Sequence, residues 1–126
     1  MTPLLAQVAT VLTLVGGQAT TIVRNPSPVE TLTVTVELRE RFVAGGQVTV
    51  GRGIDALVAP TSFTLAPGEQ QTVRLRLREK MPSGTVLAWI VTFTPSSASS
   101  DAPGSDTAPV ARLVLQTRIV AKAIVQ

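Results

Sequence analysis

The sequence predicts an all-β chain folded as an immunoglobulin-like antiparallel β-sandwich of about seven strands. Three observations support this fold class. Aromatic residues make up only 3% of the chain, while Val, Leu, Ile and Thr are abundant, and β-branched residues favour strands. Apolar and polar residues alternate with period two, and no helical period is sustained. Turn residues recur at the short intervals typical of sandwiches. Its 126 residues suit a single domain over residues 1–126.

The first half of the chain contains four expected strands. Val8–Val15 ends at Gly16-Gly17, and Ala19–Arg24 ends at the turn Asn25-Pro26-Ser27-Pro28. Thr31–Val43 is the most regular strand, because its alternation is that of a strand with one wet face. Its inward residues are Leu32, Val34, Val36 and Leu38, and its outward residues are Thr33, Thr35, Glu37, Arg39 and Arg41. Ala44-Gly45-Gly46 then turns the chain into Gln47–Val50.

The second half continues with shorter pieces and two clear strands. In order they are the loop Gly51–Asp55, the edge piece Ala56–Val58, the strand Ser62–Leu65, the turn Ala66–Glu69, and the strands Gln71–Arg78 and Val86–Thr94. Gln71–Arg78 alternates strictly, with Val73, Leu75 and Leu77 inward. Val86–Thr94 is apolar on both faces, as a central strand should be, and we expect its Trp89 to anchor the core.

Two segments are unusual in composition. Residues 1–23 carry no charge, so Leu4–Val15 lacks the basic start of a secretory signal and is too often interrupted for a membrane helix. Met1 is therefore either native or the replacement of a removed signal peptide. Residues 96–108 form a polar low-complexity stretch that predicts a flexible loop. Asp101 and Asp106 within it supply too few oxygens for a calcium site, which favours a solvated linker.

The last strand, Val110–Gln126, is longer than one sandwich needs, since strands usually span about 3–10 residues. One side is almost wholly apolar: Ala111, Leu113, Leu115, Thr117, Ile119, Ala121, Ala123 and Val125. The other side supplies the predicted partner-binding residues, Val114, Gln116, Arg118, Val120, Lys122 and Ile124. An edge strand that exposes apolar groups pairs readily with another polypeptide. The alternative is an edge strand that overruns its sheet and frays. The uncharged segment Thr2–Gln7 is also a candidate for pairing.

The side-chain inventory argues against catalysis. The chain has no Cys and no His, which removes thiolate metal sites and the commonest bases and nucleophiles. The acids are scattered, and Glu37 and Glu40 fall on opposite faces of one strand. We therefore expect no enzyme activity, no catalytic residue, no cofactor and no metal site.

A basic stripe is the one concentration of charge. Arg74, Arg76 and Arg78 point outward from one strand, in a chain of net charge +3. One interpretation is a docking site for an acidic surface or for a phosphate backbone. The other is a solvated face whose charges discourage aggregation. Nucleic-acid binding is disfavoured because aromatic residues for base stacking are scarce.

The segment from Val58 to Leu75 resembles the N-terminal domain of PapD-like periplasmic pilus chaperones, which is close in fold to major sperm protein domains. Its pattern is Pro60-x-x-Phe63-x-Leu65-x-Pro67-Gly68-x-x-Gln71-x-x-Arg74. Arg24-Asn25-Pro26 resembles the turn that ends the second strand of that family, and Leu115-Gln116-Thr117-Arg118-Ile119 resembles its last strand. The resemblance runs from about Val8 to Val125 and implies a PapD-like immunoglobulin-like sandwich.

The chain departs from the pilus chaperones where they bind their subunits. These chaperones hold the terminal carboxylate of a subunit with a basic residue on the first strand and a Lys on the last. Here the first strand has no Arg or Lys, and Val120 stands at the expected Lys position. The second chaperone domain and the Pro-containing exit from the last strand are also missing. The resemblance therefore carries over the fold and not the chaperone mechanism.

These observations lead to a non-enzymatic structural module that binds copies of itself or a larger particle through edge strands and termini. A virion decoration or coat role and a surface-filament role both fit, so a virion or extracytoplasmic location is favoured over the cytoplasm. The alternative is a periplasmic pilus-type chaperone or adaptor that binds client β-strands.

Overall fold

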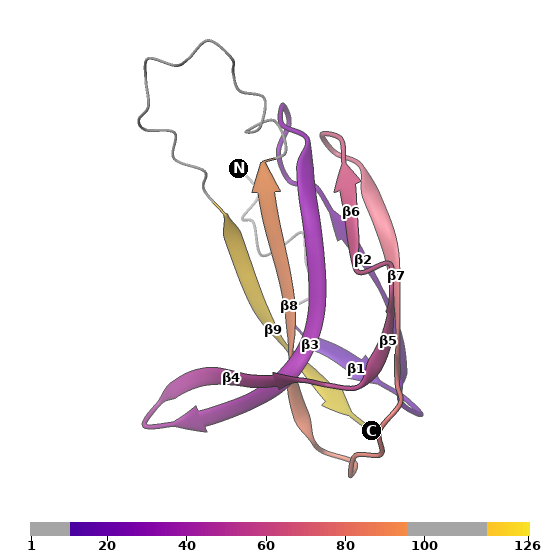
Figure 1. Cartoon of the computed structure of the whole chain (residues 1–126), viewed down its shortest axis with the longest axis vertical. Helices are drawn as coiled ribbons and strands as arrows, with labels where there is room; N and C mark the ends of the chain where they lie inside the picture. Colours follow the sequence, from indigo (N-terminus) through magenta and orange to yellow (C-terminus); the bar gives the residue numbers. More distant parts are fainter. Residues whose placement is uncertain (1–10, 96–115) are drawn as a thin grey trace.

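Two β-sheets face each other in the computed structural model, which describes residues 11–95 and 116–126 (Figure 1). These residues form nine strands and no helix. The strands are β1 (Val11–Leu14), β2 (Gln18–Arg24), β3 (Leu32–Ala44), β4 (Gln47–Gly53), β5 (Ala56–Ala59), β6 (Ser62–Leu65), β7 (Gln70–Leu77), β8 (Val86–Pro95) and β9 (Thr117–Val125). The described part of the chain accordingly contains no helix that could cross a membrane.

The larger sheet has six strands in the order β1-β9-β8-β3-β4, with β6 also paired to β3, and the smaller sheet has the order β2-β7-β5. Neighbouring strands run antiparallel except β1 and β9, which run parallel. The predicted immunoglobulin-like sandwich is confirmed. The described residues form nine strands rather than about seven because the short pieces β5 and β6 each form a ladder of their own.

The core lies between the two sheets because their strands alternate apolar and polar residues. On β3, the residues predicted to point inward, Leu32, Val34, Val36 and Leu38, are all buried. Trp89 on β8 is completely buried, as predicted. Its Nε1 has no hydrogen-bond partner among the described residues, so Trp89 stabilises the core through packing rather than through a polar contact.

The last strand alternates as predicted but is not an edge along its whole length. Ile119, Ala121, Ala123 and Val125 are buried. The expectation of a free edge is wrong for residues 122–125, because β1 pairs with them in parallel. Residues 8–10 of the predicted first strand, the predicted loop 96–108 and residues 110–115 of the predicted last strand lie outside the described residues.

The expected loop Gly51–Asp55 is wrong in its first part, because Gly51–Gly53 extend β4. The register of β3 and β4 shifts between Arg39 and Arg41, because β4 has one extra residue there and forms a bulge. Next to it, Arg39 Nε donates a hydrogen bond of 2.7 Å to the Gly51 carbonyl. A stretch of Gly, Arg and Gly has no apolar alternation, so its sequence gave no strand signal. Bulges of this kind bend a strand, and Figure 1 shows the β3–β4 hairpin turned sideways from the rest of the large sheet.

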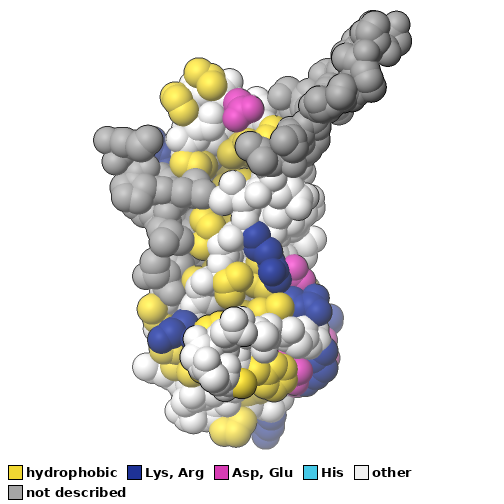
Figure 2. All heavy atoms as spheres, turned by 90° about the vertical axis from the view of Figure 1, so that its left-hand side faces the viewer, with side chains coloured by type: hydrophobic (Ala, Val, Ile, Leu, Met, Phe, Trp, Pro, Cys, Tyr) yellow, Lys and Arg dark blue, Asp and Glu magenta, His cyan; other side chains and the backbone are white. Residues whose placement is uncertain are grey.

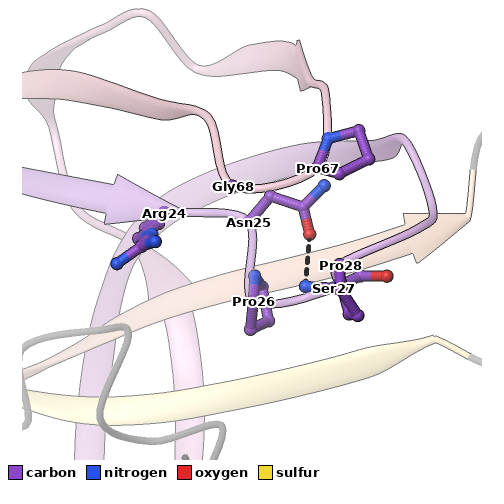
Figure 3. Close-up of a pocket in the computed structure, with 7 residues that line it drawn as sticks. All are labelled: Arg24, Asn25, Pro26, Ser27, Pro28, Pro67 and Gly68. Carbon is purple, nitrogen blue, oxygen red and sulfur yellow. Dashed lines mark hydrogen bonds between the residues drawn. The ribbon is translucent and has the colours of Figure 1, made fainter.

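A buried amide holds the turn after β2 against the turn between β6 and β7 (Figure 3). The side chain of Asn25 is almost completely buried. Its Nδ2 donates to the carbonyls of Glu30 at 2.7 Å and Leu65 at 3.0 Å, and its Oδ1 accepts from the Ser27 N–H at 2.8 Å. Buried carbonyls need such partners, which explains why an Asn stands in this turn.

An ion-pair network holds the base of the β3–β4 hairpin. Arg52 contacts the carboxylates of Glu40 at 3.2 Å and Glu79 at 2.9 Å. The hydrogen bond from Arg52 is the main reason that the pKa of Glu79 lies below its usual value of 4.5, and the N–H of Asp55 adds to the effect. Glu79 reciprocally raises the pKa of Arg52. The network ties the hairpin base to the end of β7.

Replacing Asn25 with Ala should lower the free energy of unfolding by about 3 kcal/mol, because two acceptor carbonyls lose their donor. Ser27→Ala is the control, since its hydroxyl accepts only exposed hydrogen bonds from Val29 and Glu30, and should cost about 1 kcal/mol or less. Urea unfolding followed by the fluorescence of the single Trp measures both. Equal losses in the two variants would contradict this role of Asn25.

Glu79→Gln should destabilise the protein at neutral pH by an amount that shrinks in acid. A carboxylate with a lowered folded-state pKa stabilises the fold fully above its unfolded-state pKa, and this contribution is lost as the pH falls through the folded-state pKa. The gap between wild type and variant should therefore close below pH 4.5, the usual pKa of the group. Urea unfolding across pH measures it, with Glu30→Gln as the exposed control. A gap that stays constant in acid would be the contrary result.

Candidate protein-binding surfaces

The outward face of β9 brings together most of the predicted partner-binding residues. Arg118, Val120 and Lys122 are exposed in one row, next to Thr92, Ile90 and Ala88 of β8 respectively. Gln116 precedes the strand, and its Nε2 donates to Thr94 Oγ1 at 3.2 Å. Ile124 is half-buried, and Val114 lies outside the described residues. The face combines two cations with an exposed valine and carries no acid.

Over part of its length, the backbone edge of β9 has no partner among the residues that the structure describes, and we call this part the open edge. β1 pairs with the edge at residues 122–125, from Val11 opposite Lys122 to Leu14 opposite Val125. Within residues 11–95 and 116–126, nothing pairs with residues 117–121 on that side. Unpaired N–H and C=O groups in an extended strand can accept a further strand.

A hollow of about 370 Å³ lies beside this open edge, where the β3–β4 hairpin approaches β9. Its lining residues are Val11, Arg41, Val48, Val120, Ala121 and Lys122. Val11, Val48 and Val120 are 50%, 47% and 42% exposed, which is high for valine. Neither Arg41 nor Lys122 forms an ion pair with any described residue. The hollow can therefore accept an apolar side chain next to a negative charge.

The β3–β4 hairpin carries exposed apolar residues that the sequence interpretation overlooked. Phe42 and Val43 are 52% and 57% exposed. The view along the projecting hairpin shows hydrophobic side chains on the lower part of this face (Figure 2). The signal was present in the sequence, because apolar residues occur on both faces of the strand beyond Arg39. The pattern of one wet face predicted for Thr31–Val43 does not account for them.

The predicted basic stripe is only partly assembled. Arg74 and Arg76 are exposed on β7, and a hollow of about 490 Å³ lies beside them against β2 and β5. Arg78 follows the end of β7 and pairs with Asp55 at 3.3 Å. The stripe thus keeps two cations without an acidic partner among the described residues.

The described residues contain no group of three His, Cys, Asp or Glu side chains that could hold a metal ion. The ion pairs among them join Arg52 to Glu40 and Glu79, Arg78 to Asp55, and Arg39 to Glu37. What the surfaces of β9 and the hairpin offer is backbone pairing and apolar contact, which are means of binding a polypeptide.

No protein-family model matches the chain, and no curated protein is significantly similar to it in sequence. Solved structures are similar in fold. A chain from the complex of the Salmonella enterica SafA pilin with the SafB chaperone is 23% identical, with a TM-score of 0.67 and coverage of 94% of this chain and 51% of that one. The E. coli chaperone DraB is 16% identical, with a TM-score of 0.63 and coverage of 94% and 52%.

WR4, a Caenorhabditis elegans member of the MSP family, is 15% identical, with a TM-score of 0.53 and coverage of 92% of this chain and 90% of that protein. The chain thus spans about half the length of the chaperone structures and nearly all of the MSP protein. The likeness extends through both sheets. The chain has the PapD-like, major sperm protein-like immunoglobulin fold.

Proposed function

We propose that the protein is a non-enzymatic assembly module that binds an extended segment of another polypeptide along β9. The partner is a further copy of the chain or a component of a larger particle, such as a virion or a surface filament. The observation that carries the proposal is the edge of residues 117–121, which has no partner within residues 11–95 and 116–126, beside the exposed Val120. The module acts outside the cytoplasm or on a virion.

The edge supplies affinity and the side chains supply selectivity. A strand that adds to β9 forms main-chain hydrogen bonds whatever its sequence, and its alternate side chains then meet the outer face. There Val120 and Val11 offer apolar contact, while Arg118 and Lys122 repel a basic segment. The preferred partner is an alternating apolar strand of neutral or negative charge.

A second candidate is a chaperone or adaptor that holds the carboxylate of a client strand. The hollow beside β9 supports this candidate, because Lys122 on the last strand and Arg41 on the hairpin both line it. Arg41 can take the place of the first-strand basic residue that pilus chaperones use and that this chain lacks. The fold is also that of a chain from a pilin–chaperone complex. The two candidates differ in whether the partner needs a free carboxyl terminus.

Val120→Lys should weaken the binding of an alternating Val/Thr peptide about tenfold, because it places a third cation on the face and removes an apolar contact. We expect the wild-type protein to bind the fluorescein-labelled, C-terminally amidated peptide with a Kd of about 100 µM or tighter, measured by fluorescence anisotropy. Val29→Lys, at a residue that is 79% exposed on a distant turn, is the matched control and should bind normally. Absent binding, or equal effects of the two substitutions, would argue against β9 as the site.

The same peptide with a free carboxyl terminus distinguishes the second candidate. If Arg41 and Lys122 hold a carboxylate, the free acid should bind about tenfold more tightly than the amide. Arg41→Gln should abolish this preference, whereas Arg74→Gln on the other sheet should leave it unchanged. Equal affinity of acid and amide would rule out the chaperone-like role and leave the assembly role standing.

A further inference from the structure

The β3–β4 hairpin beyond Arg39 is a two-stranded arm that carries apolar residues on both faces. Val43 lies opposite Val48, Phe42 opposite Thr49, and Arg41 opposite Val50. Phe42, Val43 and Val48 are all about half exposed. A two-stranded hairpin alone is only marginally stable in water, and exposed apolar groups on it are typical of an interaction site.

The arm is held in a defined position by its base. Arg52 bridges Glu40 and Glu79, and Arg39 Nε donates to the Gly51 carbonyl. A Cβ at Gly51 would lie 2.6 Å from Cε2 of the Phe42 ring. The ring therefore packs over the Gly51 backbone. An arm that is fixed in this way presents its outer edge at low entropic cost to a partner.

Between Gln47 and Val50, the free edge of the arm lacks the features that keep edge strands apart. Among the described residues, β4 pairs only with β3. The segment from Gln47 to Val50 contains no charge and no Pro, and it pairs with β3 without interruption, because the bulge of β4 falls at Gly51 and Arg52. Proteins usually protect a solvent-exposed edge with charged residues, proline or bulges. The edge is therefore competent to pair with another strand.

We propose that β4 pairs antiparallel with β4 of a second copy, around a two-fold axis at Thr49. Pairing centred there sets Val48 opposite Val50 of the second copy and Gln47 opposite its Gly51. The observed β3–β4 register then extends each row across both hairpins. On one face, Val48 of each copy then lies next to Val50 of the other. On the opposite face, the two Thr49 residues are adjacent, and each is flanked by Phe42 of its own chain. Both hairpins become one four-stranded sheet.

A second copy fits this edge better than an unrelated partner because the edge is self-complementary. In a two-fold interface the same surface of both copies is in contact, so a charged residue near the axis would lie close to a charge of the same sign. The segment from Gln47 to Gly51 is uncharged, and the nearest cations on the two strands, Arg41 and Arg52, fall at the margins. Arg52 is also neutralised by Glu40 and Glu79 of its own chain.

This dimer contact uses β4 and does not depend on the proposed binding of a polypeptide along β9. A contact between two hairpins is small for a specific interface, so we expect a dimer Kd of about 10–100 µM. Sedimentation velocity of the full chain over a concentration series measures it. Thr49→Lys should weaken the dimer about tenfold or more, because two lysines then face each other across the axis. Thr72→Lys, on the middle strand of the smaller sheet, is the matched control and should leave the dimer unchanged.

Cysteine cross-linking provides a second readout, since the chain has no cysteine of its own. Thr49→Cys should form a disulfide-linked dimer on mild oxidation, because directly opposed Cβ atoms in antiparallel strands lie about 4.5–5.5 Å apart. Thr72→Cys should remain largely monomeric on a non-reducing gel. Circular dichroism of each variant checks that the fold is retained.

The outcomes separate this contact from the β9 site. Wild-type protein that remains monomeric up to about 1 mM would overturn the hairpin dimer. A dimer that is weakened by Val120→Lys and not by Thr49→Lys would also overturn it, while supporting self-assembly through β9. Loss of the dimer in Thr49→Lys, together with unchanged peptide binding, would establish the hairpin contact as separate.

Discussion

The packing of the two inner sheet faces against each other is the interaction on which the rest of this structure depends. Trp89, Leu14, Val23, Val34 and Val73 are completely buried between the sheets. Because side chains of a strand alternate between faces, burial of one set fixes the register of every strand and the direction of the other set. The outward positions of Val120, Arg118 and Lys122 follow from the burial of Ile119 and Ala121.

Two polar arrangements hold parts of the structure that the apolar core does not: the turn after β2 and the base of the β3–β4 hairpin. The Asn25 amide satisfies carbonyls at one end of the sandwich, and the Arg52 network ties the hairpin base to the end of β7. The two differ in strength, since the amide is buried and the ion pairs are exposed to solvent. The first therefore matters mainly for stability, and the second mainly for the position of the arm.

The edges of the large sheet are the surfaces on which both binding proposals rest. In the part of the chain that the structure describes, β1 pairs with one end of β9, residues 117–121 have no partner on that side, and β4 has a partner on one side only. The open part of β9 and the hairpin meet at the hollow that Val48, Val120 and Arg41 line. One side of the sandwich thus holds both edges on which the proposals of strand pairing rest, and the basic residues of β7 lie on the other sheet.

The sequence by itself determined the sandwich, most strand positions and the inward residues, because period-two alternation is a local property of the chain. It also identified Trp89 as a core residue and the outward row of β9. Tertiary structure decided which strand edges lack a partner among the described residues, since the pairing of β1 with β9 joins segments that lie far apart in the sequence. It likewise decided that β4 extends through Gly51–Gly53 and that Phe42 and Val48 are exposed on an arm. Those features depend on a register shift and on contacts between distant residues, which no local pattern of hydrophobicity encodes.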